Sequence, residues 1–202
     1  MTETVSTANV STQSTQSTGF TLIEVLVTLA IIAIGLLGVG VLQARLQQTE
    51  LEAYDRAQAL VLLDAMVSRI YANRQTAPCY AITTLTTGVP YLGYADVNHA
   101  AAVTCAGYGN ASTQQTAVND LNDWDAMLKG TSEAIGGTAV GATLGARGCI
   151  TFNDVTFTYT ITVTWQGMTQ TAAPTVACAI NAYGAETLRR AVSVTFRPAA
   201  LL

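Results

Sequence analysis

The sequence predicts an α+β protein in which a long N-terminal α-helix, membrane-spanning in its first half, packs on a C-terminal antiparallel β-sheet. Three observations lead to this prediction. An apolar run extends from Val25 to Leu42, with Thr28 as its only polar side chain. A helical pattern of apolar residues continues from there to Arg74. Strict alternation of apolar and polar residues indicates β-structure after Cys149.

The first 18 residues are mostly Ser, Thr and Gln and carry no Lys or Arg. We expect this segment to be disordered, because it has no apolar face to bury. A helix from Phe20 to Leu42 would be about 34 Å long, which is enough to span a bilayer core of about 30 Å. Residues 20–42 are therefore predicted to cross a membrane.

Glu24 lies near the start of the apolar run and has two interpretations. A carboxylate inside a bilayer costs several kcal/mol, so it indicates a functional role. Alternatively, Glu24 lies in the first helical turn near the headgroups, where the helix dipole favours an anion. Sequence physics alone leaves both interpretations open.

The second half of the helix, residues 43–74, is amphipathic. We expect it to end near Arg74, because Pro78 cannot continue a helix. On the polar face, Glu52 and Arg56 have the i,i+4 spacing of an ion pair. The predicted buried face consists of Leu42, Leu46, Thr49, Ala53, Ala57, Leu60, Leu63, Val67 and Ile70.

Residues 75–202 are predicted to form a globular domain that begins with a loop-rich segment, residues 75–118. A short capped helix is expected at Asp120–Leu128. Its three acidic residues lack the Asp-x-Asp-x-Asp-Gly pattern of a calcium loop, so no metal site is predicted. The Gly-rich residues 130–148 are expected to form a loop or a hairpin.

The C-terminal part is predicted to form consecutive strands with short turns, which favours an antiparallel sheet. Gln166-Gly167 is expected to be a turn, and Thr169–Ala179 an irregular partner strand. Leu188–Phe196 is expected to be the last strand, with Arg189-Arg190 at a solvated strand start. One face of the strand before the turn would carry Phe157, Tyr159, Ile161, Val163 and Trp165.

Composition argues against several classes of protein. The chain has 202 residues, nine Lys and Arg, and a net charge of −4, so a basic stripe for nucleic-acid phosphates is not expected. His99 is its single histidine, and neither Ser132 nor Ser193 has a nucleophile motif around it. We therefore predict no enzymatic activity, no cofactor and no metal.

The four cysteines have no Cys-x-x-Cys spacing, which argues against zinc. An even count after a membrane anchor favours two disulfides in an oxidising compartment, although four free thiols are the alternative. Four cysteines allow three connectivities, and the sequence alone does not choose among them. We predict Cys79 with Cys105 and Cys149 with Cys178, each closing a loop of about 25–30 residues and stabilising by about 3–4 kcal/mol.

The N-terminal segment carries a resemblance to a known family. Gly19-Phe20-Thr21-Leu22-Ile23-Glu24-Val25-Leu26, followed by an apolar helix, resembles the processing site of a type IV prepilin. The resemblance implies the type IV pilin fold and cleavage after Gly19 by a membrane prepilin peptidase. It further implies N-methylation of the new N-terminus, Phe20, and a role for Glu24 in the entry of subunits into the filament. A secretory signal peptide would instead be cut on the far side of a short apolar region.

The leader departs from that family, because prepilin leaders are usually short and carry Lys or Arg. Arg45 and Arg56 would also favour the opposite membrane orientation by the positive-inside rule. The resemblance nevertheless implies that residues 1–19 are a cytoplasmic leader and that residues 75–202 are periplasmic. The protein would cross the bacterial inner membrane once and later join a pilus at the cell surface.

Further stretches resemble the PilV-type minor pilins, also called type IV pilus modification proteins. This likeness implies a subunit that helps to prime pilus assembly and can sit at the tip with an adhesin. Its partners would be other minor and major pilins, the prepilin peptidase and the inner-membrane assembly platform. The stretches that carry the likeness are Ile34–Gly38, Ala57–Arg74, Asp120–Trp124, Gly148–Ile150, Thr160–Trp165 and Arg189-Arg190.

Two other functions compete with this interpretation. A minor pseudopilin of a type II secretion system would use the same N-terminal helix. A DNA-uptake pilin would need a basic groove, for which Arg189, Arg190 and Arg197 are the available residues.

Overall fold

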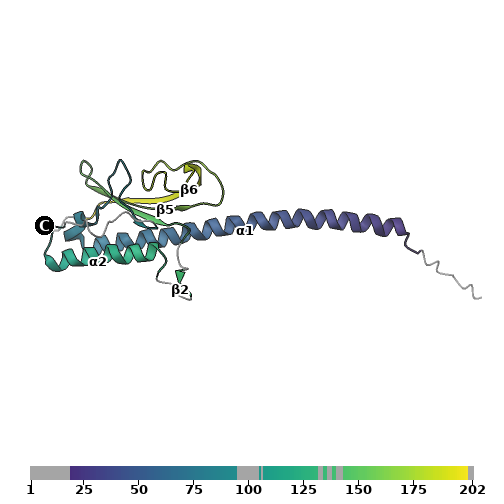
Figure 1. The fold of residues 1–202 in the computed structure, drawn as a ribbon, viewed down its shortest axis with the longest axis horizontal. Helices are drawn as coiled ribbons and strands as arrows, with labels where there is room; N and C mark the ends of the chain where they lie inside the picture. Colours follow the sequence, from purple (N-terminus) through teal and green to yellow (C-terminus); the bar gives the residue numbers. More distant parts are fainter. Residues whose placement is uncertain are drawn as a thin grey trace, which may run out of the picture. The chain divides into compact units, whose positions relative to one another are not determined.

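The computed structural model describes residues 19–94, 105, 107–131, 134–135, 138–139 and 143–199. These residues form a long N-terminal helix, a shorter second helix and a small four-stranded antiparallel sheet (Figure 1). This α+β arrangement matches the type IV pilin fold, and the predicted fold class is confirmed. The chain divides into an N-terminal unit, residues 1–46, and a globular unit, residues 47–202.

The long helix α1 extends from Leu22 to Ala72 and contains 51 residues. Thr21 caps its N-terminus, because the Thr21 Oγ1 accepts a hydrogen bond of 3.3 Å from the backbone N–H of Glu24. The helix ends just before the predicted boundary at Arg74, where a 3-10 helix, η1 (Arg74–Tyr80), begins. The sequence therefore located both ends of α1 to within a few residues.

One stripe of α1 is buried in the globular unit and forms the base of its core. The predicted buried face is wrong in part, since Leu60 is 48% exposed and both Ala53 and Ala57 are exposed. Residues 59–63 are all apolar, so periodicity does not select one face there. The residues of α1 that are buried are Ala59, Leu62, Leu63, Met66 and Ile70.

The second helix, α2, extends from Ala111 to Leu128 and lies antiparallel to the end of α1. The indole Nε1–H of Trp124 donates a hydrogen bond of 2.8 Å to the backbone carbonyl of Leu62. Further along α1, Arg69 pairs with Asp120, and the Asn73 side chain donates to the Thr113 carbonyl. The partner number on α2 falls as the number on α1 rises, which defines the antiparallel arrangement.

The predicted start of this helix at Asp120 is wrong, because α2 begins at Ala111. Asn110 is its N-cap: the Asn110 Oδ1 accepts from the Thr113 N–H at 3.1 Å. In return, the Thr113 Oγ1 accepts from the Asn110 N–H at 2.9 Å. This reciprocal pair is a capping box with Asn and Thr in place of the usual Ser or Thr and Glu. The predicted loop-rich segment 75–118 is thus shorter than expected.

The four-stranded sheet has the order β1-β4-β5-β6, and every neighbouring pair is antiparallel. A separate two-stranded ribbon, β2 with β3, lies within the Gly-rich segment for which a loop or hairpin was predicted. The strands are β1 (Leu92–Gly93), β2 (Ala134–Ile135), β3 (Thr138–Ala139), β4 (Arg147–Asn153), β5 (Thr158–Gln166) and β6 (Arg189–Phe196).

Two predictions for the sheet are wrong. Phe157 does not share the buried face of β5; it lies in the turn after β4, with a φ of 54° and 57% of its surface exposed. Thr169–Ala179 forms no strand, and β6 pairs with β5 in its place. The turn between β4 and β5 is stabilised by the Asn153 side chain, which accepts hydrogen bonds from the Val155 and Thr156 N–H groups.

The inner face of the sheet joins both helices in one hydrophobic core. Tyr71 of α1 contacts Phe196 of β6, with ring centroids 5.2 Å apart. Gly148 of β4 lies against α2, where a Cβ atom at this position would come within 2.6 Å of side-chain carbons of Trp124 and Leu128. The missing side chain of Gly148 therefore allows α2 and the sheet to approach closely.

We expect Gly148→Ala to destabilise the globular unit by about 1–3 kcal/mol, because the added methyl group overpacks this contact. Chemical denaturation of the full-length protein in detergent measures the loss. Leu128→Ala removes one of the obstructing side chains, so the double variant should lose less stability than the sum of the single variants. Simple additivity would contradict the close-packing explanation.

Candidate functional site

The predicted processing site, Gly19-Phe20, lies immediately before α1. Both residues are exposed, and Phe20 has 84% of its surface accessible. A Cβ atom at Gly19 would meet no other atom within 4 Å. Packing within the chain therefore gives no reason for a glycine at this position. A requirement for glycine here would have to come from a molecule that recognises the segment.

Glu24 lies in the first turn of α1, near the positive end of the helix dipole. Its backbone N–H is bonded to both the hydroxyl and the carbonyl of Thr21. The Thr21-x-x-Glu24 spacing is the sequence pattern of a capping box, a signal that the sequence analysis missed. The first-turn position suits an anion.

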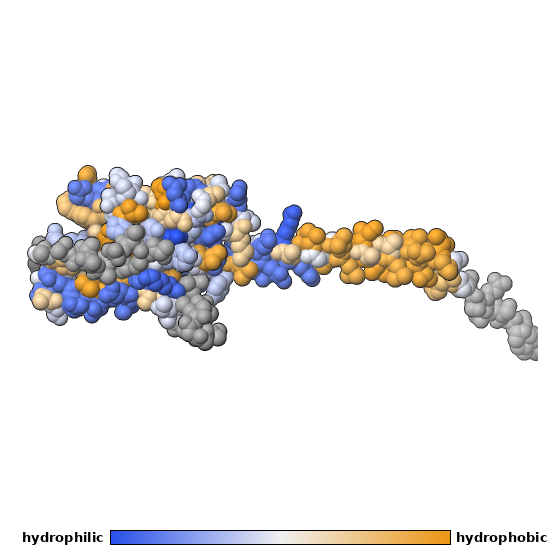
Figure 2. Space-filling view, in the orientation of Figure 1, coloured by the Kyte–Doolittle hydropathy of each residue, from blue (hydrophilic) through white to orange (hydrophobic). Residues whose placement is uncertain are grey.

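The N-terminal half of α1 is apolar around its whole circumference from Val25 to Leu42, apart from Thr28, and this segment is exposed. Figure 2 shows this as a continuous apolar surface along the visible face of the segment. The hydroxyl of Thr28 donates a hydrogen bond of 2.9 Å to the carbonyl of Val25, so the one polar side chain of the apolar run is satisfied within the helix. By length and composition, α1 can cross a membrane.

Three glycines lie within this apolar segment, at Gly35, Gly38 and Gly40. A Cβ atom at any of them would meet no other atom within 4 Å outside the backbone of the helix itself. Their small size therefore serves no packing within the chain. Small residues on an apolar helix allow another helix to approach closely in a membrane or filament.

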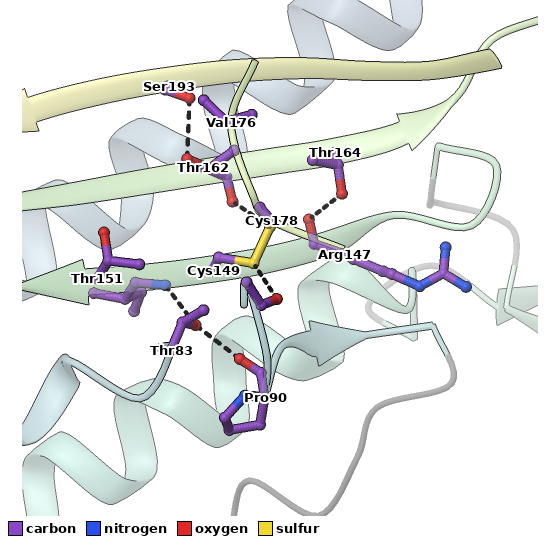
Figure 3. Close-up of a disulfide and its surroundings, with 12 residues drawn as sticks. Thr83, Pro90, Arg147, Cys149, Thr151, Thr162, Thr164, Val176, Cys178 and Ser193 are labelled. Atoms are coloured by element: carbon purple, nitrogen blue, oxygen red, sulfur yellow. Dashed lines mark hydrogen bonds between the residues drawn. A yellow bond between two sulfur atoms is a disulfide. The ribbon is translucent and has the colours of Figure 1, made fainter. Parts of the chain in front are cut away.

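The four predicted disulfide cysteines are buried and lie together in the two predicted pairs. Cys79, in η1, lies opposite Cys105 with a Cα–Cα distance of 5.1 Å. Cys149, in β4, lies opposite Cys178 with a Cα–Cα distance of 5.8 Å. Figure 3 shows the second pair joining the sheet to the segment that precedes β6. Both separations fall in the range that a disulfide spans.

The prediction that Arg189 lies at a solvated strand start is wrong, because its side chain is 1% exposed. The guanidinium donates hydrogen bonds of 2.8, 3.1 and 3.1 Å to the carbonyls of Val176, Cys178 and Pro174. It also forms an ion pair with Glu186 at 2.6 Å. Arg189 thus fixes the irregular segment that crosses the outer face of the sheet.

The ion pair changes the acidity of Glu186. Burial raises the pKa of this carboxyl, but the Arg189 guanidinium and the backbone N–H of Asn181 outweigh burial and hold the pKa below its ordinary value. Glu186 therefore stays ionised, which compensates the buried charge of Arg189. The i,i+3 spacing of opposite charges was the signal in the sequence, although it did not reveal that the pair is buried.

Arg190 is also engaged within the fold. It pairs with Glu52 of α1 at 3.2 Å and donates to the Thr169 carbonyl at 2.6 Å. The Glu52–Arg56 pair suggested by spacing is therefore replaced by a contact between α1 and the sheet. Burial raises the pKa of Glu52, but the Thr169 hydroxyl and Arg190 bring it below its ordinary value.

Engagement of these arginines weighs against a DNA-binding patch. Arg189 is buried, and Arg190 is bound to a carboxylate and a carbonyl. The guanidinium of Arg197 lies 5.6 Å from the ring of Phe157. The three side chains therefore do not form the basic groove that phosphate binding would need.

A second arginine, Arg147, is also buried, and the sequence did not predict its burial. It is 5% exposed and lies among the rings of Tyr91, Tyr94 and Tyr183, at 5.4, 5.3 and 4.3 Å from their centroids. These cation–π contacts and a hydrogen bond to the Gly145 carbonyl hold the side chain. Arg147 thereby connects the end of β4 to the segments on either side of it.

The acidic residues of α2 serve packing contacts. Asp120 accepts hydrogen bonds from Arg69 and the Tyr80 hydroxyl, and burial together with this carboxylate raises the pKa of Tyr80 well above its ordinary value. Asp123 pairs with Arg69, and Asp125 accepts from Lys129. Within the part of the chain that the structure describes, no group of His, Cys, Asp and Glu is arranged to hold a metal ion.

Of the three residues weighed for catalysis, Ser193 lies in the described part of the chain. His99 and Ser132 lie outside the described residues. The Ser193 hydroxyl lies on the outer face of the sheet and shares a hydrogen bond of 3.0 Å with Thr162 (Figure 3).

Comparison with known protein families finds a match in the N-terminal part of the chain. Residues 15–40 match the family model of the prokaryotic N-terminal methylation motif. This range contains Gly19, Phe20, Glu24 and most of the apolar run. Neither a curated protein nor a solved structure matches the chain. The motif and the fold together support a type IV pilin-like or pseudopilin subunit, a structural class that is processed by prepilin peptidase and assembles with other pilins.

We expect non-reducing peptide mapping of the mature protein to find Cys79 linked to Cys105 and Cys149 linked to Cys178. Each bridge closes a loop for which chain entropy gives about 3–4 kcal/mol, so Cys149→Ser should lower the unfolding temperature clearly. A peptide joining Cys105 to Cys149 would contradict the pairing. Four alkylatable thiols in the native protein would contradict both bridges.

Proposed function

We propose that this protein is a minor pilin of a type IV pilus, of the PilV type, which helps to prime pilus assembly and sits at the tip with an adhesin. The observation that carries the proposal is the methylation motif at the start of a helix whose segment Val25–Leu42 is exposed and, apart from Thr28, apolar on every side. Such a surface suits a membrane first and a filament core later. The further stretches that resemble PilV-type minor pilins support the finer assignment.

The proposal divides the chain into four parts. Residues 1–19 are a leader that prepilin peptidase removes, and residues 20–42 are the segment that crosses the membrane and later enters the filament core. Residues 43–74 are the amphipathic half of the same helix. Residues 75–202 are the periplasmic domain. The subunit starts in the bacterial inner membrane, contacts the assembly platform there, and ends in the pilus with other minor and major pilins.

Cleavage creates a charge that Glu24 is placed to offset. After removal of residues 1–19, the α-amine of Phe20 becomes a positive charge at the positive end of the helix dipole, which disfavours it. The Glu24 carboxylate lies one helical turn further on. In a filament core of low dielectric constant, it would form a charge-assisted pair with this amine or with that of a neighbouring subunit.

A minor pseudopilin of a type II secretion system is the second candidate, because the same motif and helix serve that assembly. Affinity purification of the full-length protein from membranes, followed by mass spectrometry, separates the two. Co-purification with pilus subunits supports the minor pilin. Co-purification with secretion-system subunits supports the pseudopilin.

We expect Gly19→Arg to block processing, because a peptidase site that reads a small side chain rejects a long charged one. The mass of the N-terminal peptide in membrane preparations measures the result. Gly19→Ala is the matched control, since the chain has room for the methyl group and its folding should not change. An intact residue 1–19 segment in assembled pili of the unaltered protein would contradict the proposed function.

We expect Glu24→Val to be processed and inserted normally, because loss of a charge makes the helix more apolar. Its incorporation into pili should fall about tenfold or more, since hydrogen bonds to charged groups contribute about 1.5–3 kcal/mol. Quantitative immunoblots of sheared pili against membranes measure the ratio. Glu24→Gln is the isosteric control and should show a similar defect if charge is required. Normal incorporation of Glu24→Val would refute this role.

A further inference from the structure

The strand β6 forms one edge of the sheet and is long for an edge strand. It extends over eight residues, Arg189–Phe196, in an unbroken antiparallel register with β5. In the sheet that the structure describes, β5 is its partner on one side and no strand lies on the other. An edge of this kind leaves a row of backbone N–H and C=O groups unpaired.

The alternation of hydrogen-bonded and non-hydrogen-bonded pairs along β5 and β6 identifies which backbone groups of β6 face the free edge. The Gly167 N–H donates to the Leu188 carbonyl at 2.8 Å, and this pair continues the register of β5 with β6. Hydrogen-bonded pairs recur every second residue in an antiparallel ladder. Arg190, Val192, Val194 and Phe196 therefore bond to β5. The N–H and C=O groups that point to the free edge belong to Ala191, Ser193 and Thr195.

The other side of β5 gives an independent check of this phase. The β6 residues that bond to β5 are paired with odd-numbered residues of β5. The backbone groups of the even-numbered residues of β5 must therefore bond to β4. Ile150 of β4, paired with Ile161, must then direct its backbone groups away from β5. The Ile150 N–H and C=O indeed both bond to Thr83, on the far side of β4.

The edge lacks the devices with which proteins usually prevent strand addition. Between Arg189 and Phe196 there is no Pro, no Lys and no β-bulge. The Ser193 and Thr195 side chains are exposed, small and β-compatible. Val192, Val194 and Phe196 are partly buried against the core and hold the strand in place.

A groove accompanies the start of this edge, between α1 and the sheet. Its cavity volume is about 380 Å³, and Ala191 of β6 forms part of its wall. The Arg190–Glu52 ion pair and Arg56 supply charges of both signs. Trp165 also lines the groove, and its buried indole Nε1 has no hydrogen-bond partner among the described residues. The groove therefore offers a bound segment charged groups of both signs and one N–H donor that is unpartnered among the described residues.

We propose that the free edge of β6 binds an extended segment of a neighbouring pilin-type subunit, which adds to the sheet as a further strand. Unpaired donors and acceptors that recur at every second residue, about 6.8 Å apart, match another extended backbone. The groove receives the side chains at one end of the added strand. The inference rests on the proposed function, because it takes the partner from the same assembly.

Ser193→Pro tests the edge in the full-length protein. Proline removes the Ser193 N–H, which β5 does not use, and its ring obstructs an approaching strand. Proline also removes the Ser193 hydroxyl, which is hydrogen-bonded to Thr162, so the matched control is Ser193→Ala, which loses the same hydroxyl and keeps the N–H. We expect incorporation into pili to fall about two- to tenfold for Ser193→Pro and to remain unchanged for Ser193→Ala. Equal incorporation of both variants, with the unfolding temperature preserved, overturns the proposal.

Two further measurements keep the test decisive. If Ser193→Pro does not fold, Ser193→Lys places a charge at the edge without altering the backbone, and the same loss is expected. A photoreactive benzoylphenylalanine at position 195 should cross-link to an extended segment of a subunit that carries the N-terminal methylation motif. The same group at Val155, which is 83% exposed in the β4–β5 turn, should not. A cross-link from position 195 to a helix, or none at all, overturns the proposal.

Failure of strand addition at β6 can be distinguished from failure of the proposed function by following processing of the N-terminus. The N-terminal peptide of every edge variant should show normal removal of residues 1–19, because the edge lies in the globular unit. If the protein is processed and incorporated, and the Ser193 variants are incorporated equally well, strand addition at β6 is refuted while the proposed function stands. A protein that is neither processed nor incorporated refutes the proposed function itself.

Discussion

The packing of one stripe of α1 supports both α2 and the four-stranded sheet of the globular unit. Ala59, Leu62, Met66 and Ile70 lie at helical spacing, and both α2 and the inner face of the sheet complete the core above them. The Trp124 indole bonds to the carbonyl of Leu62, within this stripe. The same helix is apolar on all sides before Leu42. The stripe is therefore where α1 changes from a segment that needs other molecules around it to one that is covered by its own chain.

Two buried arginines lie toward the outer face of the sheet. Arg189 binds three carbonyls and a carboxylate, and Arg147 lies among three tyrosine rings. A buried guanidinium is costly unless its donors are satisfied, so the contacts of Arg189 determine the path of the segment that precedes β6. The proximity of Cys149 to Cys178 depends on the same loop, because Arg189 binds the Cys178 carbonyl.

Residues that act locally were predictable from the sequence, and residues that act through tertiary contacts were not. The apolar run and the Gly19-Phe20 junction depend on adjacent residues alone, and the helix and the motif were both found. Leu60 was misplaced because five consecutive apolar residues give no preferred face. Arg189 was misplaced because its partners, Pro174 and Val176, become neighbours only when the loop folds back on the sheet. The capping box of Asn110 with Thr113 was local but chemically unusual, and it was missed for that reason.

The antiparallel contact between α2 and α1 has a mechanical consequence. The hydrogen bonds at Leu62, Arg69 and Asn73 are spread along the axis of α1 and reach successive positions of α2. A tension that arrives along that axis loads all three bonds together, in shear. Bonds loaded together share the force, whereas bonds loaded in succession break one at a time. The globular unit is thus built to stay attached to its own helix when that helix is pulled.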